Sequence, residues 1–154
     1  MAGWAIMLGV FSAVAGAPAA QDMVIADIHR SEWTPSLRLK LGLRSGAFEI
    51  ALPQDREWHS HLPRPAPREG KLSKDHLQEV ARAAAEVASA GLADQACERE
   101  WADARRRGGV IIGNAVSPDY MSIRWQGITI SSPETQWCRS SAAKRLMTLL
   151  DRLF

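Results

Sequence analysis

The two cysteines are the side chains whose chemistry constrains this sequence most. Cys97 and Cys138 are the only thiols in the chain. In an oxidising compartment such a pair most simply forms a structural disulfide. Two alternatives remain open: a zinc site, for which a cysteine pair without nearby histidines offers too few ligands, and a nucleophilic thiol, which needs an unpaired cysteine beside a base. We expect the disulfide, and no catalysis from it.

The spacing of the histidines raises the question of a metal site. His59 and His61 flank Ser60 in a Pro-rich stretch, where His76 or Glu57 could supply a third ligand. Solvated loop histidines give the same pattern, and the sequence contains no H-E-x-x-H, C-x-x-C, G-x-S-x-G or Gly-rich phosphate-binding motif. No two carboxylates stand out as an acid–base pair. We therefore predict no metal, no cofactor and no catalytic residue, with an unrecognised hydrolase as an alternative.

Tryptophan is abundant after residue 21, in a stretch with a single tyrosine. Trp101 and Trp125 fit core positions, and Trp137 would shield the cysteine beside it. Trp33 and Trp58 lie in irregular segments, where flat apolar side chains suit contact with a partner, either a protein or the sugar rings of a cell-wall glycan. The residues that we predict to bind a protein partner are Trp33, Ser45, Gly46, Trp58, His59 and His61.

The first residues of the chain predict export. The first charged side chain is Asp22, the run from Trp4 to Ala17 is apolar, and Ala17-Pro18-Ala19 matches a cleavage site. Residues 1–19 are therefore predicted to be a cleaved signal peptide, although this one lacks a basic residue near its start. An uncleaved membrane anchor is the alternative, and only in that form would the protein contact a membrane. The expected location is the periplasm or the outside of a bacterial cell.

The charge of the chain argues against nucleic-acid binding. The formal net charge is +2, without the concentrated basic face that a nucleic-acid footprint needs. Arg105-Arg106-Arg107 is the only basic run, and it is typical of a solvated helix end whose charges complement the helix dipole. We therefore expect a protein partner and no nucleic acid.

Alternating apolar residues predict a β-hairpin early in the chain. Leucines occupy every second position from Leu37 to Leu43, and apolar side chains return at every second position from Phe48 to Leu52. Gly46 provides the positive φ that such turns often need. The Pro-rich, charged stretch 53–72 that follows is predicted to be a long surface loop.

Two helices are predicted after this loop. Ser73 is a suitable N-cap, and an apolar stripe runs from Leu77 to a stop at Gly91. A shorter helix is expected from Asp94 to Gly108, with a strand beginning near Trp101 as the alternative.

The C-terminal part repeats the order of strands and helix. Residues 109–116 suit a short buried strand, and 120–131 alternate as a second hairpin around Gln126-Gly127. The final helix would be capped by Ser140 or Ser141 and carries a stripe of leucines.

These elements predict an α+β fold, a two-layer sandwich in which an antiparallel sheet from two β-hairpins is covered by two or three amphipathic helices. Residues 20–36 would be an N-terminal arm, although their apolar patch could also form a leading strand. Residues 37–154 would form a single domain. The Cys97–Cys138 bridge would clamp the helical layer together.

The layout resembles emfourin-type bacterial inhibitors of metallopeptidases, over about residues 37–154. The resemblance is carried by "RSGAFEI", "LQEVARAAAEVASAGLAD", "DYMSIRWQGITI" and "LMTLLDRL". This chain differs in its long insertion at 53–72, its export signal, its predicted disulfide and its single Gly46 in the first turn. The resemblance implies a small α+β protein that blocks a protease by inserting loops, without catalysis of its own.

Overall fold

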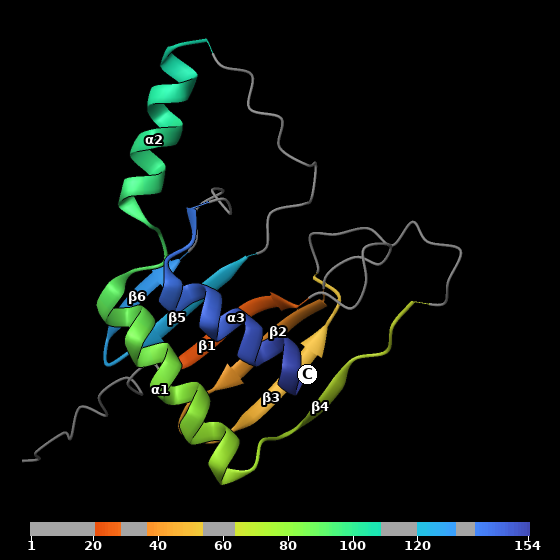
Figure 1. Cartoon of the computed structure of the whole chain (residues 1–154). Helices are drawn as coiled ribbons and strands as arrows, with labels where there is room; N and C mark the ends of the chain where they lie inside the picture. The colour runs from red at the N-terminus through yellow and green to blue at the C-terminus, as the bar shows by residue number, and fades with distance from the viewer. Residues whose placement is uncertain (1–20, 29–36, 54–63, 109–119, 132–137) are drawn as a thin grey trace, which may run out of the picture.

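The structure is a computed structural model of the chain, and it describes residues 21–28, 37–53, 64–108, 120–131 and 138–154. Within these ranges the chain forms an antiparallel six-stranded sheet and three helices, which confirms the α+β prediction (Figure 1). The strands are β1 (Met23–Ile28), β2 (Leu37–Gly42), β3 (Ala47–Ala51), β4 (Arg68–Lys71), β5 (Met121–Trp125) and β6 (Ile128–Ser131). The helices are α1 (Lys74–Ala90), α2 (Gln95–Arg106) and α3 (Ser141–Leu153).

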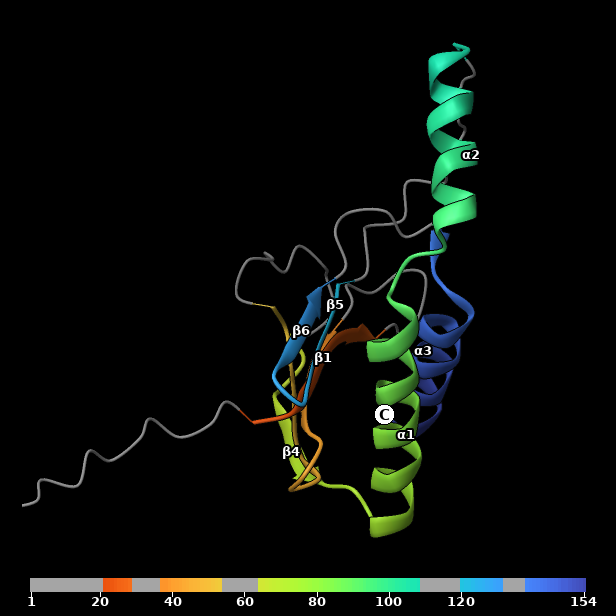
Figure 2. The same ribbon diagram turned by 90° about the vertical axis from the view of Figure 1, so that its left-hand side faces the viewer.

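The strands lie in the order β4-β3-β2-β1-β5-β6, and every neighbouring pair is antiparallel. Helices α1 and α3 pack on one face of the sheet, and the opposite face carries no helix in the part of the chain that the structure describes (Figure 2). None of the helices in the described ranges is long and apolar enough to cross a membrane.

The predicted hairpin alternation sets the two faces of the sheet. Leu39 and Leu41 are fully buried on the helix-covered face, whereas Arg38 and Lys40, which alternate with them, point to the open face. Ile123 in β5 is likewise buried. Leu39, Leu41 and Ile123 belong to one core with the buried residues of α1 and α3. Period-2 alternation therefore identifies the core side of the sheet correctly.

Strand β1 is the central strand of this sheet. Its residues pair with β2 on one side, from Met23 opposite Gly42 to Ile28 opposite Leu37, and with β5 on the other. Residues 23–28, which were placed in an N-terminal arm, thus form the leading strand that was the alternative. Likewise the predicted loop 53–72 contains the edge strand β4.

Both helices of the covering layer begin where capping rules predict. The Ser73 hydroxyl accepts a hydrogen bond from the backbone N–H of His76, and the Ser140 hydroxyl accepts one from Ala143. Helix α1 ends at Gly91, whose φ of 82° favours glycine. Val80, Ala84 and Val87 give α1 a narrow buried stripe, and α3 buries a wider one of six residues.

Helix α2 lies outside the two layers. It has no buried residue and projects from the end of α1, away from the sheet (Figures 1 and 2). Asp94 caps its N-terminus by accepting hydrogen bonds from Ala96 and Cys97, so this segment is the predicted helix and not the alternative strand. The sheet is therefore covered by two helices.

The predicted disulfide between Cys97 and Cys138 is present, with the two Cα atoms 5.3 Å apart. It joins the first turn of α2 to the segment that enters α3. Backbone hydrogen bonds run alongside it, from Asp94 N–H to the Cys138 carbonyl and from Ser140 N–H to the Leu92 carbonyl. The bridge thus secures the projecting helix to the body, and the α1–α3 layer is held by its own apolar contacts.

Replacement of both cysteines by serine is expected to lower the free energy of unfolding by up to about 4 kcal/mol, because the bridge closes a loop with a sequence separation of 41. Urea denaturation of the Cys97→Ser/Cys138→Ser variant would measure this change. Alkylation of the native protein, followed by mass spectrometry, should modify neither thiol before reduction. A labelled native thiol would contradict the bridge.

Gly46→Ala is expected to destabilise the protein more than Gly127→Ala. Both glycines have positive φ, which costs other residues about 1–2 kcal/mol. At Gly46 the added Cβ would also lie 3.3 Å from the Leu77 side chain, whereas nothing lies within 4 Å at Gly127. Urea midpoints of the two variants measure the difference, and equal midpoints would show that the Leu77 contact adds no cost.

Candidate partner-binding site at one end of the sheet

The strand pairing brings several chain connections to one end of the sheet. Ile28 at the end of β1 lies opposite Leu37 at the start of β2. Arg68 at the start of β4 pairs with Ile50 near the end of β3. Residues 29–36 and 54–63 therefore leave the sheet at the same end, which we call the loop end.

The other half of the sheet has its long connections at this end too. Ala26, near the end of β1, pairs with Met121 at the start of β5, and Ser122 pairs with Ser131 at the end of β6. Residues 109–119 and 132–137 therefore also attach at the loop end. At the opposite end lie the β2–β3 turn, Gln126-Gly127 between β5 and β6, the entry into α1 and the start of β1.

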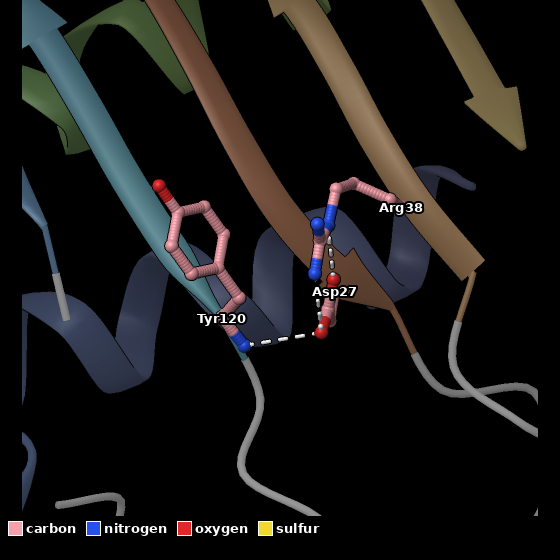
Figure 3. Close-up of polar contacts among 3 residues, drawn as sticks. All are labelled: Asp27, Arg38 and Tyr120. Carbon is pink, nitrogen blue, oxygen red and sulfur yellow. Dashed lines mark hydrogen bonds and ion pairs between the residues drawn. The ribbon is translucent and has the colours of Figure 1, made fainter. Parts of the chain in front are cut away.

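A buried ion pair stands at the loop end on the open face. The Asp27 side chain is fully buried, and its Oδ1 accepts a hydrogen bond of 2.9 Å from Arg38 Nε. Its Oδ2 accepts from the backbone N–H of Tyr120 at 3.2 Å and from a terminal guanidinium nitrogen of Arg38 at 3.5 Å (Figure 3). The Arg38 guanidinium also lies 4.9 Å from the centre of the Tyr120 ring, in a cation–π contact.

This cluster joins three adjacent strands just where the chain leaves the sheet. Asp27 belongs to β1, Arg38 to β2, and Tyr120 immediately precedes β5. A buried carboxylate is stable only when it is paired and hydrogen-bonded, and both Asp27 oxygens have such partners. Asp27 therefore positions the loop end, and its hydrogen-bonded oxygens are poorly suited to act as a nucleophile or general base.

A groove of about 500 Å³ lies on the open face beside this cluster. Arg38 belongs to both the groove and the cluster, and Lys40 and Glu49 form an exposed ion pair of 3.4 Å in the groove wall. Pro53 directly precedes the 54–63 segment, and Pro67 directly precedes β4. The groove thus combines charges of both signs with small and apolar surface. Its lining residues are Arg38, Lys40, Glu49, Ala51, Leu52, Pro53 and Pro67.

Sequence reasoning missed the Asp27–Arg38 pair. The available signal was a single carboxylate inside the otherwise apolar run "MVIADI" of β1. That signal becomes meaningful only when β1 is known to be central and Arg38 is known to lie opposite Asp27.

The predicted partner-binding residues divide into two groups. Trp33, Trp58, His59 and His61 lie outside the described residues, but the segments that contain them are attached at the loop end. Their contact role stays a prediction.

Ser45 and Gly46 lie in the turn between β2 and β3, at the opposite end of the sheet. A six-residue strand such as β2 separates them from the loop end by about 17 Å. Ser45 is exposed, and its hydroxyl accepts a hydrogen bond from the backbone N–H of Ala47. Gly46 is buried against Leu77 of α1 and accepts a hydrogen bond from the Leu72 N–H. Gly46 thus has a structural role, because it joins the first hairpin to the start of α1.

The tryptophans expected in the core differ from one another. Trp125 is partly buried and packs against the core, as predicted. Trp101 is only half-buried on the projecting helix α2, and Trp137 lies outside the described residues.

Among the described residues, no group of three His, Cys, Asp or Glu side chains could hold a metal ion. Of the four histidines, only His76 is described, and its side chain is exposed at the start of α1.

Comparison of the chain with protein-family models, with curated proteins and with solved structures found no match.

Asp27→Asn is expected to lower the free energy of unfolding by about 3 kcal/mol, because it removes the buried charge that pairs with Arg38 and places an NH2 group where an oxygen accepts hydrogen bonds. The matched control is Glu49→Gln, which removes the exposed Lys40–Glu49 pair and should cost less than about 1 kcal/mol. Urea denaturation measures both. Similar losses of unfolding free energy in the two variants would mean that the buried Asp27–Arg38 pair stabilises the protein no more than the exposed Lys40–Glu49 pair does.

Proposed function

We propose that this chain is an exported, non-catalytic protein that binds a protein partner through the loop end of its sheet. The observation that carries the proposal is that four segments of the chain attach at the same end of the sheet, where the Asp27–Arg38–Tyr120 cluster joins three strands. These segments are residues 29–36, 54–63, 109–119 and 132–137. Binding residues are found disproportionately on loops that a rigid scaffold positions.

The rigidity of the scaffold at this end supports the proposal. The Asp27–Arg38–Tyr120 cluster ties β1, β2 and β5 together at the end of the sheet where these segments attach. A partner surface built on a fixed base loses less conformational entropy on binding than one built on a loosely held base. Trp33 and Trp58 belong to segments that start from this base, so two large contact side chains are available to it.

The disulfide supports the exported location. Such bridges form and persist in oxidising compartments, and the N-terminal sequence has the composition of a signal peptide. The proposal therefore places the protein in the periplasm or outside the cell.

A peptidase is the partner class that the proposal favours. The groove beside Asp27 carries both charge signs and apolar surface, which suits contact with a protein surface. The resemblance of the sequence layout to emfourin-type inhibitors indicates a metallopeptidase. In this reading the attached segments would block the partner's active site, and the chain would perform no reaction.

The proposal is tested by removal of one attached segment. Replacement of residues 54–63 by a Gly-Ser linker should reduce inhibition of metallopeptidases from the same compartment at least about tenfold, because contact energy is concentrated in a few aromatic side chains such as Trp58. The urea midpoint should stay close to that of the unaltered protein, since the linker leaves every described strand in place. Ser45→Ala is the comparison variant: the sequence also suggests Ser45 as a contact residue, but it lies at the opposite end of the sheet, so a contact through the loop end predicts unchanged inhibition.

A photoreactive residue distinguishes the two ends directly. Placed at the exposed position Arg64 it should cross-link the bound peptidase, and placed at Gln126, at the opposite end, it should not. Cross-links from Gln126 alone would refute the loop end as the contact surface. Binding of cell-wall fragments with a tryptophan fluorescence change, and no effect on any peptidase, would favour the glycan-binding alternative.

A further inference from the structure

The two edge strands of the sheet differ in how they are protected. Strand β4 has the sequence REGK and lies beside Pro65 and Pro67, and charge and proline are common protections of an exposed edge. Strand β6 has the sequence ITIS, with no charge, no proline and three β-branched residues. Its Ile128 is 54% exposed and is the only large apolar side chain so exposed within the described residues. The β6 edge therefore has the composition of a strand that pairs with another.

The geometry of the β5–β6 hairpin shows which backbone groups face outward. Trp125 pairs with Ile128 across the two-residue turn Gln126-Gly127, and both turn residues have positive φ. Such a turn is closed by a hydrogen-bonded pair, and hydrogen-bonded and non-hydrogen-bonded pairs then alternate along the strands. The N–H and C=O groups of Thr129 and Ser131 consequently point away from β5, toward the free edge.

We infer that two copies of this chain associate through antiparallel pairing of their β6 edges, with the two-fold axis at Ile130. In this register Thr129 of one copy lies opposite Ser131 of the other, and the reverse pair forms across the axis. The outward N–H and C=O groups of both residues are then all hydrogen-bonded. The described part of the edge is self-complementary in this arrangement, as an interface between identical chains requires.

The side chains fit the same register. Ile130 would meet its own copy across the axis, and Ile128 would lie diagonally beside it, so that apolar side chains gather on the helix-covered face. No charged residue lies in β6, so no like charges stand directly opposite one another. Arg124 on β5 lies beside this strand, and its Nε donates to the Thr129 hydroxyl within its own chain at 3.4 Å. A second copy is thus the occupant that the sequence of this edge favours.

The contact is short, so the dimer should form in a concentration-dependent manner. A four-residue strand offers less buried area than interfaces of stable, permanent dimers. Each β6 strand reaches the loop end of its own sheet at Ser131. Because the two paired strands run in opposite directions, the loop ends of the two copies point to opposite sides.

Sedimentation equilibrium of the full mature chain, over a range from low micromolar to millimolar concentration, tests the pairing. A mass approaching that of two chains is expected at the upper end. Thr129→Pro removes one outward N–H from each copy and places a ring on the edge, while the bonds between β5 and β6 remain. It should raise the dimer dissociation constant about tenfold or more. Thr129→Val keeps the N–H and the branched shape, and it should dimerise like the unaltered chain.

A cross-link identifies the register. Ile130→Cys should form a covalent dimer on mild oxidation, because the two side chains meet at the axis. Glu69→Cys on the β4 edge is the matched control and should stay monomeric. A monomer at every concentration would overturn the inference, as would a dimer that survives Thr129→Pro unchanged or cross-links as well through Glu69→Cys.

Discussion

The fully buried carboxylate of Asp27 is the constraint on which the loop end depends. Because a buried charge needs an opposite charge and hydrogen-bond donors, Arg38 and the N–H of Tyr120 have to lie beside it. Arg38 lies in β2 and Tyr120 immediately precedes β5, so one electrostatic requirement holds β1, β2 and β5 together at the end where the chain leaves the sheet. The other face of β1 carries Val24, Ala26 and Ile28 in the core. A single strand thereby joins the helix-packed layer to the open face.

The individual hairpins and helix starts could be predicted from the sequence, whereas the order of the strands in the sheet could not. Alternation of apolar residues gave both hairpins, and the serine caps gave the starts of α1 and α3, because each feature depends on neighbours along the chain. The central position of β1 depends on pairing with β5, far away in the sequence. Strand β4, with the sequence REGK, has no apolar alternation at all, and only its pairing with β3 makes it a strand. The Asp27–Arg38 pair was missed for the same reason.

The disulfide shows a similar division. Cysteine count and an export-like N-terminus were enough to predict the bond between Cys97 and Cys138, since only one pairing was available. Its mechanical role needed the structure, because the sequence from Asp94 to Gly108 did not reveal that this helix buries no residue. The bridge consequently holds α2 against the segment before α3. The α1–α3 layer is joined by buried valines and alanine of α1 and by the apolar stripe of α3, with the Arg145–Glu86 and Arg152–Glu79 ion pairs on its surface.

The proposed partner surface and the proposed pairing edge are compatible because they lie on different sides of the same sheet. Partner contact would occur at the loop end, along the strand direction, whereas pairing of β6 extends the sheet sideways. A two-fold axis through Ile130 reverses the strands, so each loop end of a dimer would face away from the other and stay accessible. Two accessible ends on one particle raise the effective concentration of the second site when the partner is itself clustered. An uncharged edge such as β6 is a disadvantage in a monomer, because it can pair with other chains. In the proposed dimer the same edge would form the interface.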